Sequence, residues 1–342
     1  MPKQTTLKDV AKQANVSFQT VSKVLNKKAR VSPETEKRIF EAIQALDYHP
    51  NFTARSLRIQ KTYTIGYSWR PSQPGRYNPI LDEFLQGMFQ TAENCGYNLL
   101  CFPYSLDPQK RVANYKELIR SRRVDAFVLS TVNYEEPGIR FLVDNQIPFY
   151  AFGRASKDQT FPYIDVDGGA GLQSAVDHLV KQGHHCIGAL AWPLDSRVGN
   201  DRMEGYFTQI QKHNLPLEGN LVFRGEGTAA IGYAGMEQLL GLPADVRPTA
   251  VVTMNDEMAF GAIAKLRDVD LVPGKDFGVV GFDDVPAARL ARPSLSSIHQ
   301  PADRIGKLIL ERLINWLETE KYPEPATELI NPELIIRESS QR

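Results

Sequence analysis

The amino-acid sequence predicts an all-α helix-turn-helix head joined to an α/β body of two doubly wound parallel-sheet subdomains. The first 50 residues carry three short stretches in which apolar residues recur at helical spacing. From residue 62 onward, short apolar runs alternate with amphipathic stretches, a pattern typical of buried parallel strands joined by crossover helices. The alternation runs through one series and starts again near Gly168, so we expect two similar halves.

The head begins with two helices joined by a short turn. Thr6 stands before an apolar-periodic run and Asp9 follows three residues later, so Thr6 is expected to cap a helix over residues 7–13. Ser17 is expected to cap a second helix over residues 18–25. Two helices with so short a connection cannot lie antiparallel, and the helix-turn-helix is the usual arrangement.

The rest of the head is expected to be a third helix and a short hinge. Ser32 can cap the third helix, and Pro33 suits its first position. Asn51 can cap a short helix over residues 52–58, which is below the roughly 12–15 residues at which isolated helices become marginal in water. This hinge helix is therefore expected to order only when something packs on it.

The head is basic and the body is acidic. Residues 1–61 hold twelve Lys and Arg against five Asp and Glu, a net charge of +7, so the remainder of the balanced chain carries −7. Phe18, Gln19 and Lys23 point outward on the second helix, where amide, ammonium and aromatic groups can contact base edges. A solvated face is the alternative for these residues, but the charge favours nucleic acid binding by the head.

Three runs of the head resemble the lac repressor/galactose repressor family of bacterial transcription regulators: LKDVAKQANVSFQTVSKVLN, VSPETEKRIFEAIQALDYHPN and ARSLR. The similarity continues along essentially the full chain. The resemblance implies that Phe18, Gln19 and Lys23 read the major groove, while neighbouring residues hold the DNA backbone or flank. The expected DNA-binding residues are Thr6, Ser17, Phe18, Gln19, Thr20, Ser22, Lys23, Asn26, Arg30, Asn51, Ala54, Leu57 and Arg58.

Leu57 has two interpretations. An apolar residue between Arg55 and Arg58 can be a core contact with the body or a wedge inserted into the minor groove. The resemblance favours the wedge, because in this family paired hinge helices of a dimer lie in the minor groove.

The resemblance also implies a periplasmic-binding-protein-like body, with three chain crossings between its halves and a hinge-bending cleft. The expected bounds are 1–50 for the head, 51–61 for the hinge and linker, 62–163 with 294–325 for the N-terminal subdomain, and 164–293 with 326–342 for the C-terminal subdomain.

Polar and aromatic side chains gather in the loops after the expected strands. Ligands in open α/β sheets bind at the carboxyl ends of strands, and Arg, Asp and Asn mixed with aromatic residues suit a neutral polyhydroxylated ligand. Asp residues in such loops also cap helices, and we assign Asp195, Asp256 and Asp284 to that role. The expected effector-binding residues are Trp69, Tyr77, Asn78, Arg154, Asp167, Trp192, Arg202, Asn255 and Asp283.

Four of these residues match ligand-binding positions of the family. Arg202 and Asp283 correspond to a guanidinium and a carboxylate that grip ligand hydroxyls, and Asp167 and Asn255 to two further polar positions. Unpaired charges in a closed cleft are costly, so Arg202 and Asp283 are expected to pair with each other when no effector is bound.

The aromatic positions depart from the family. Members often carry aromatic residues after the Asn-Pro of the first loop and near residue 227, where this chain has Ile80, Leu81 and Gly227. Without aromatic residues at these positions, a purine effector would have no rings to stack on there. We therefore expect a sugar, which can be larger than a monosaccharide, to stack on one of Trp69, Tyr77 and Trp192.

The sequence disfavours several other classes of protein. Cys95, Cys101 and Cys186 are odd in number and lack a CxxC pattern, so we expect buried reduced thiols, no metal and no cofactor. There is no apolar leader and no run near the roughly 20 residues of a membrane span, so no membrane partner and a cytoplasmic location are expected.

Catalysis is not expected. Asp165 and Asp283 could be weighed as a glycosidase pair, but the chain has no GxSxG motif, no glycine-rich phosphate loop and no convincing nucleophile with a His partner. A solute-binding protein would share the two-half cleft but would lack a basic head.

We therefore expect a repressor of carbohydrate-utilisation genes that is allosterically controlled by a small-molecule effector. One head reads only a half-site, so the partners would be palindromic operator DNA and a second copy in a homodimer. The apolar helices near residues 80–92 and 231–240 are the candidate dimer surfaces, although the same stripes suit an intramolecular core. A purine or nucleoside corepressor stays the alternative effector.

Overall fold

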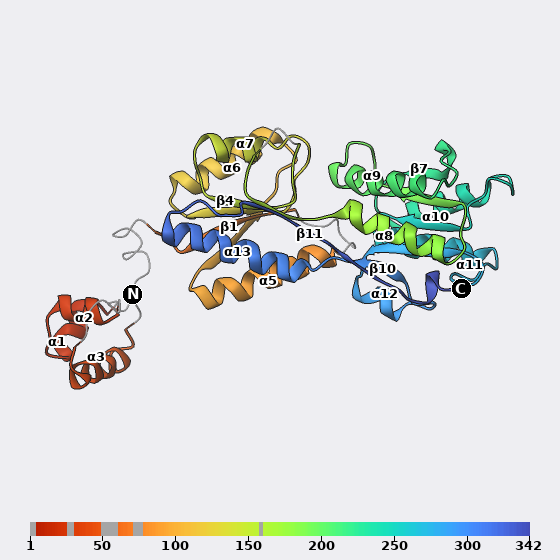
Figure 1. Ribbon diagram of the computed structural model, residues 1–342. Helices are drawn as coiled ribbons and strands as arrows, with labels where there is room; N and C mark the ends of the chain where they lie inside the picture. The colour runs from red at the N-terminus through yellow and green to blue at the C-terminus, as the bar shows by residue number, and fades with distance from the viewer. Residues whose placement is uncertain (1–4, 26–30, 49–60, 71–77, 157–159) are drawn as a thin grey trace. The chain divides into compact units, whose positions relative to one another are not determined.

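The computed structural model describes residues 5–25, 31–48, 61–70, 78–156 and 160–342 (Figure 1). Its internal contacts divide the chain into two units, residues 1–62 and residues 63–342. Seven residues with a predicted binding role lie outside the described residues: Asn26, Arg30, Asn51, Ala54, Leu57, Arg58 and Tyr77.

The described part of the head consists of helices α1 (Leu7–Gln13), α2 (Phe18–Leu25) and α3 (Pro33–Ala45), and these bounds confirm the predicted helices. Thr6 and Asp9 form the predicted capping box. Ser17 and Ser32 accept hydrogen bonds from backbone amides three residues later, as predicted. The three helices close one small core around Val10, Val21 and Ile39, which are fully buried.

The first sheet of the body is wholly parallel, in the order β11-β5-β4-β3-β1-β2. Its strands are β1 (Thr64–Trp69), β2 (Asn98–Pro103), β3 (Ala126–Leu129), β4 (Phe149–Phe152), β5 (Tyr163–Val166) and β11 (Thr327–Ile330). The helices of this half are α5 (Pro79–Cys95), α6 (Pro108–Arg120), α7 (Pro137–Asp144) and α13 (Ala302–Thr319).

Helices cover both faces of this sheet (Figure 1). On β3, Ala126 and Val128 join the cluster of α5 and α13, while Phe127 and Leu129 join the cluster of α6 and α7. Successive side chains of a strand point to opposite faces, so a central strand covered on both sides is apolar throughout. This explains why β3 reads as a continuous apolar run.

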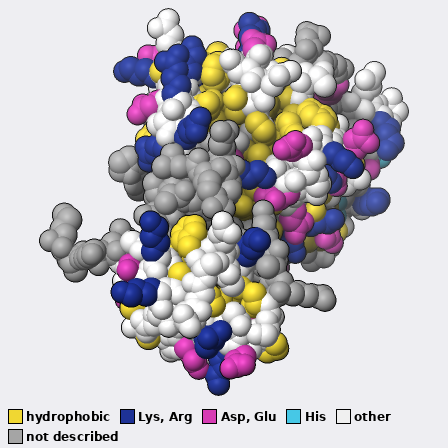
Figure 2. Space-filling model, turned by 90° about the vertical axis from the view of Figure 1, so that its left-hand side faces the viewer, with side chains coloured by type: hydrophobic (Ala, Val, Ile, Leu, Met, Phe, Trp, Pro, Cys, Tyr) yellow, Lys and Arg dark blue, Asp and Glu magenta, His cyan; other side chains and the backbone are white. Residues whose placement is uncertain are grey.

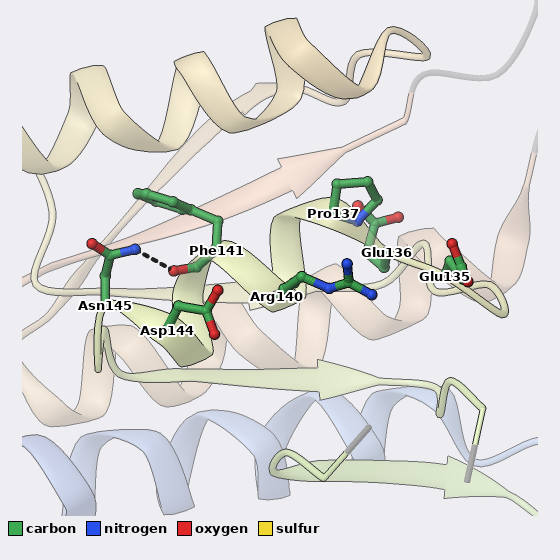
Figure 3. A pocket seen from close by; sticks show the side chains of 7 residues that line it. All are labelled: Glu135, Glu136, Pro137, Arg140, Phe141, Asp144 and Asn145. Carbon is green, nitrogen blue, oxygen red and sulfur yellow. Dashed lines mark hydrogen bonds between the residues drawn. The ribbon is translucent and has the colours of Figure 1, made fainter. Parts of the chain in front are cut away.

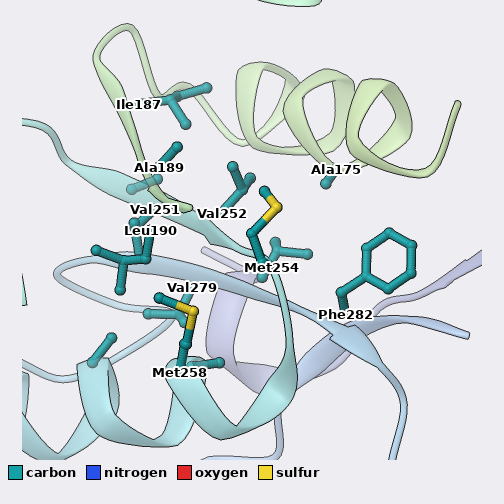
Figure 4. Packing of buried hydrophobic residues seen from close by; sticks show 14 of the residues in the cluster. Ala175, Ile187, Ala189, Leu190, Val251, Val252, Met254, Met258, Val279 and Phe282 are labelled. Atoms are coloured by element: carbon teal, nitrogen blue, oxygen red, sulfur yellow. The ribbon is translucent and has the colours of Figure 1, made fainter. Parts of the chain in front are cut away.

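The second sheet has the order β12-β10-β9-β8-β6-β7 and is parallel except for β12, which pairs antiparallel with β10. In Figure 4, Ala175 lies on α8 on one side of the strands, and Met258 lies on α11 on the other. The elements of this half are α8 (Gly168–Lys181), β6 (Ile187–Ala191), α9 (Arg197–Lys212), β7 (Val222–Arg224), α10 (Ala229–Leu240), β8 (Ala250–Thr253), α11 (Asp256–Asp268), β9 (Gly278–Asp283), α12 (Pro286–Leu290), β10 (Ser296–His299) and β12 (Glu333–Ile335).

The strand pairing corrects the predicted bounds between the two halves. β10 belongs to the second sheet and β11 to the first, whereas residues 294–325 were assigned to the first half and 326–342 to the second. The chain crosses between the halves after β5, after β10 and after β11. The sequence pattern of a short strand indicates which residues are buried, but it carries no signal for the sheet edge on which the strand pairs.

Phe89 lies on α5, in the apolar stretch that the sequence left open as a dimer surface or a core, and its side chain is 49% exposed. Cys95 and Cys101 are exposed and Cys186 is partly buried, whereas all three were expected in the core. Phe89 follows the buried Met88 directly, so it lies at the edge of the apolar stripe, where helical spacing alone does not decide burial.

Glycines let the helices of the body pack in pairs at backbone contact. A Cβ atom on Gly87 of α5 would lie 2.0 Å from the carbonyl oxygen of Asp303 on α13. The corresponding distances to a backbone carbonyl oxygen are 2.0 Å for Gly205, where α9 meets α8, and 1.9 Å for Gly261, where α11 meets α10. Each of these contacts leaves no room for a methyl group.

A buried ionic cluster joins the two halves. Arg154, which follows β4, contacts Asp165 of β5 at 3.4 Å and forms a closer pair with Asp201 of α9. Arg197, also on α9, lies 3.0 Å from the same Asp165 carboxylate. Burial raises the pKa of Asp165, and the two arginines oppose this effect.

A polar clasp lies beside this cluster. The Asn133 side chain, from the loop after β3, accepts a hydrogen bond from the amide of Arg197 at 3.0 Å and donates to the carbonyl of Asp195 at 3.0 Å. Asn200 donates to the hydroxyl of Tyr134 at 2.8 Å. The strand-end loops of the first half are therefore bound to the start of α9 in the second.

Replacing Gly87 by alanine should destabilise the body, because the added methyl group would overlap the α13 backbone. We expect a loss of about 1–3 kcal/mol, the usual cost of overpacking, measured as a lower midpoint of denaturant unfolding with an unchanged slope. Gly219→Ala is the matched control, because nothing lies within 4 Å of a Cβ atom there. Equal stabilities of the two variants would contradict the close helix contact.

Replacing Arg197 by alanine should leave the Asp165 carboxylate with one cation in place of two. Removing one partner from a buried ion pair costs about 3 kcal/mol or more, which thermal unfolding of the full chain would detect. Lys265→Ala removes the pair with the exposed Glu237 and should lower the midpoint far less. A variant at Arg197 as stable as the parent would show that the cluster does not hold the halves together.

Candidate functional site

The second helix of the head presents a polar face to solvent. Phe18 is 42% exposed, and Gln19 and Lys23 are also exposed, while Val21 and Val24 on the opposite side are buried. The three predicted base-reading residues therefore share one free surface of α2. Figure 2 shows Lys and Arg side chains at several places on the face that it presents.

The hydroxyl groups near α2 are occupied within the head. The Ser17 hydroxyl lies 2.8 Å from that of Thr20 and also accepts a hydrogen bond from the Thr20 amide. The Thr6 hydroxyl donates to Asp9 at 2.6 Å. These three predicted DNA-binding residues shape the helix starts, and amide groups at a helix start favour phosphate oxygens.

Arg202 lies at the centre of the strand-end region of the second half. Its side chain comes from α9 and is 4% exposed. The guanidinium carbon lies 3.5 Å from the ring centre of Phe282 and 5.0 Å from that of Trp192. One terminal nitrogen donates to the carbonyl of Met254, while the buried Nε atom has no hydrogen-bond partner among the described residues.

Asp283 ends β9 near this guanidinium. Its carboxylate accepts a hydrogen bond from the Gln300 side chain at 2.6 Å. Burial raises the pKa of Asp283 to about 6, against the opposing effects of Arg202 and Gln300. Burial likewise lowers the pKa of Arg202, and Asp283 opposes that change. The two charges therefore influence each other, with Arg202 buried and Asp283 partly exposed.

The expected ion pair between Arg202 and Asp283 is not among the ion pairs of the described residues. Arg202 instead contacts two aromatic rings and the carbonyl of Met254, and Asp283 accepts a hydrogen bond from Gln300. Neutral and aromatic partners thus replace the direct contact.

Trp192 and Gly227 fit closely together. A Cβ atom on Gly227 would lie 2.6 Å from the indole nitrogen of Trp192 and 2.9 Å from the side-chain nitrogen of Asn255. The indole nitrogen is buried and has no hydrogen-bond partner among the described residues. The indole therefore leaves no room for a side chain at position 227.

Three predicted effector-binding residues begin helices. The side chains of Asn78, Asp167 and Asn255 accept hydrogen bonds from backbone amides at the starts of α5, α8 and α11. The prediction that Asp195, Asp256 and Asp284 are caps is wrong, because the cap is in each case the neighbouring residue, namely Ser196, Asn255 and Val285.

Two other predicted effector-binding residues have no contact with Arg202 or Asp283 among those described above. Arg154 belongs to the ionic cluster, with both of its partners already in contact. Trp69 is 43% exposed at the end of β1. Phe282 and Gln300 were not predicted from the sequence. An apolar residue inside a strand and an amide after a strand give no distinctive signal, and only the folded geometry brings them to Arg202 and Asp283.

One cavity of about 250 Å³ lies away from this region (Figure 3). Its lining follows a single helix, α7, and the loop before it: Glu135, Glu136, Pro137, Arg140, Phe141, Asp144 and Asn145. None of the predicted effector-binding residues lines it. Ligand sites in this class of fold lie at strand ends, so the region around Arg202 and Asp283 is the better candidate.

The described residues contain neither a membrane-spanning helix nor a metal-binding cluster. No helix there combines the length and apolarity needed to cross a bilayer. No three His, Cys, Asp or Glu side chains there are grouped so that they could hold a metal ion.

Comparison with known proteins identifies both units. Residues 6–51 match the family model for bacterial regulatory proteins of the lacI family, and residues 176–340 match a periplasmic binding protein-like domain. The HTH-type transcriptional repressor PurR of Photorhabdus laumondii subsp. laumondii is 34% identical, and the match covers 98% of this chain and 96% of that protein.

Solved structures of bacterial regulatory proteins also resemble this chain. A LacI-family regulatory protein from Chloroflexus aggregans is 44% identical with a TM-score of 0.78, over 82% of this chain and 99% of that one. The lac repressor dimer bound to operator and the anti-inducer ONPF is 25% identical with a TM-score of 0.84, over 99% and 100%. The complex of the regulator CelR with cellobiose is 27% identical with a TM-score of 0.73, over 98% and 100%. The chain thus belongs to the lacI family of bacterial regulatory proteins and is a DNA-binding transcriptional repressor.

Proposed function

We propose that this repressor responds to a sugar bound at the strand ends of the body, in contact with Arg202 and Asp283. The observation that carries the proposal is a pair of buried N–H donors, Nε of Arg202 and Nε1 of Trp192, which have no hydrogen-bond partner among the described residues and lie in the same region as the Asp283 carboxylate. Buried donors without partners are costly. A ligand with several hydroxyl groups can satisfy both the donors and the acceptor.

The alternative effector is a purine, which relatives named PurR favour. Against it stands the packing of Trp192 on Gly227, which leaves no space for an aromatic side chain at position 227. One face of the indole ring is also taken by Arg202. The CelR–cellobiose complex is a family precedent for a sugar, so we place the sugar first.

The DNA-binding surface is assigned to α2, with Phe18, Gln19 and Lys23 reading base edges in the major groove. Exposure of all three on one side of the helix supports this assignment. One head covers one half-site, so a palindromic operator requires two heads. Action on operator DNA also gives the protein a cytoplasmic location.

A homodimer is proposed through α5. Phe89 on this helix is exposed, whereas Met236 and Leu239 on α10, the other candidate helix, are buried in the body's own core. A large apolar side chain on a helix surface suits a protein interface. The lac repressor, which this chain resembles, is a dimer on its operator.

Removing the side chain of Gln19 or Lys23 should weaken sequence reading. If each contacts a base edge, Gln19→Ala and Lys23→Ala should each cost about 1–3 kcal/mol of operator binding and relax preference at one position per half-site. Ser22→Ala should weaken operator and random DNA alike. Fluorescence anisotropy with single-base operator variants measures this, and equal losses on operator and random DNA for all three would refute the groove assignment.

Effector binding should depend on Arg202 and Asp283. Thermal melts with glucose, galactose, cellobiose, adenine and guanine identify the ligand, because a ligand that binds the native state raises the midpoint. Arg202→Ala and Asp283→Ala should then abolish the change in Trp fluorescence that this ligand causes. Because the pKa of Asp283 is about 6, affinity should fall as the pH is lowered through 6, since the protonated carboxyl is a weaker acceptor.

Asp283→Asn supplies the control, because its affinity should be independent of pH in this range. Folding stability should depend on pH in the opposite direction to effector affinity. The pKa of Asp283 is raised from about 4 in the unfolded chain to about 6 in the folded protein, so the protein should lose stability as the pH rises between these values. Unchanged affinity in both alanine variants, with operator binding intact, would show that the effector binds elsewhere.

A further inference from the structure

The backbone at the end of β9 adopts an unfavourable conformation. Asp283 has φ 112° and Asp284 has φ 55°. Side chains other than glycine rarely adopt positive φ, and two such residues in succession persist only where the surroundings enforce them. The first of these residues is the carboxylate that the proposed function assigns to the effector.

Two fully buried side chains enforce this turn. The Ser297 hydroxyl on β10 accepts a hydrogen bond from the Asp284 amide at 3.0 Å and donates to the Asp256 carboxylate at 2.5 Å. The other oxygen of Asp256 accepts from the Val285 amide at 2.8 Å. The two amides that follow Asp283 are therefore both held by the Asp256–Ser297 pair.

The pair is enclosed on all sides. Asp256 and Ser297 have no exposed surface. A Cβ atom on Gly281 of β9 would lie 2.1 Å from an Asp256 oxygen, so the glycine provides the space that the carboxylate fills. The Asp284 carboxylate lies 2.6 Å from the Arg337 side chain.

Burial of Asp256 is costly. Desolvation raises its pKa well above the usual range, and the charge of Asp283 adds to this effect. A buried carboxyl that could be replaced by an apolar residue is a poor source of stability. Asp256 is the first residue of α11, but Asn255 is its cap. Helix capping therefore does not explain why a carboxylate is buried at position 256.

We propose that Asp256 and Ser297 are positioning residues for Asp283: they hold the turn after β9 so that the Asp283 carboxylate stays aimed at the effector. Neither side chain is assigned a contact with the effector, because the Ser297 hydroxyl and both Asp256 oxygens are already bonded to each other or to the turn. The effect on effector affinity rests on the proposed function, in which Asp283 binds the effector. The orientation of Asp283 can be tested without any effector.

The chain offers a matched pair of variants for the test. Ser296 and Ser297 are adjacent on β10 and equally buried. The Ser296 hydroxyl bonds the backbone of Arg337 and the Ser340 hydroxyl, and not the turn after β9. Ser296→Ala therefore removes a buried hydroxyl that does not bond the turn. Ser297→Ala removes a buried hydroxyl and also the hydrogen bond that it makes to the turn. Asp256→Asn tests the second partner with its shape retained.

The first measurement is the pKa of Asp283, from carbon NMR of labelled carboxyl groups in the full chain, assigned with Asp283→Asn. It should move from about 6 toward the ordinary Asp value in Ser297→Ala and stay unchanged in Ser296→Ala. The second measurement uses cellobiose as the probe. Its affinity should fall about ten-fold in Ser297→Ala, as when partners that orient a binding group are removed, with effector-free operator affinity unchanged.

Equal pKa changes in the two serine variants, or no change in either, would overturn the positioning role. Asp283→Ala separates this result from a failure of the proposed function. If that variant binds cellobiose as the parent does, or if the parent does not bind it, the pKa measurement alone decides the positioning role. If Asp283→Ala loses binding and Ser297→Ala keeps it, the site is right and the positioning role is wrong.

Discussion

The geometry of parallel strands determines where the chemistry of this protein can lie. A crossover helix returns the chain to the same edge of the sheet, so the carboxyl ends of parallel strands collect at one edge. Trp69, Arg154, Trp192 and Asp283 come from different strands, and each stands at or just after a strand end. The ionic cluster and the Asn133 clasp then bind the strand-end loops of the two halves together.

This arrangement places charges where water does not reach. Asp165, Arg202 and Asp256 are all buried, and their pKa values are shifted against ionisation. Such groups destabilise a fold unless they are paired, and their retention is a sign of function. Asp165 has two arginines and serves the contact between halves. Arg202 has no ion pair among the described residues and is held by aromatic rings and a backbone carbonyl, which is why we propose its region, and not the Asp165 cluster, as the binding site.

The sequence predicted local features well, because local chemistry decides them. Thr6, Ser17 and Ser32 cap the helices they precede, and α1 and α2 have their predicted bounds. Features that depend on partners distant in the sequence were predicted poorly. β10 and β11 pair in the halves opposite to those expected, since a short apolar run does not specify its neighbour.

In the candidate site, too, the residue types were predicted better than their contacts with residues distant in the sequence. Arg202 and Asp283 were predicted together and interact electrostatically, but their direct ion pair does not form. The competing partners, Phe282 and Gln300, carry no sequence motif and become visible only when β9 and β10 are folded side by side. Arg154 was predicted for the effector, but Asp165 and Asp201 occupy it.

We propose that an effector site in the body and the DNA-binding head are coupled in one chain. The most direct measurement is the affinity of the effector for free protein and for operator-saturated protein. Coupling between two binding sites is reciprocal, so operator should change effector affinity by the same factor by which the effector changes operator affinity. Identical effector affinities with and without operator DNA would contradict the account.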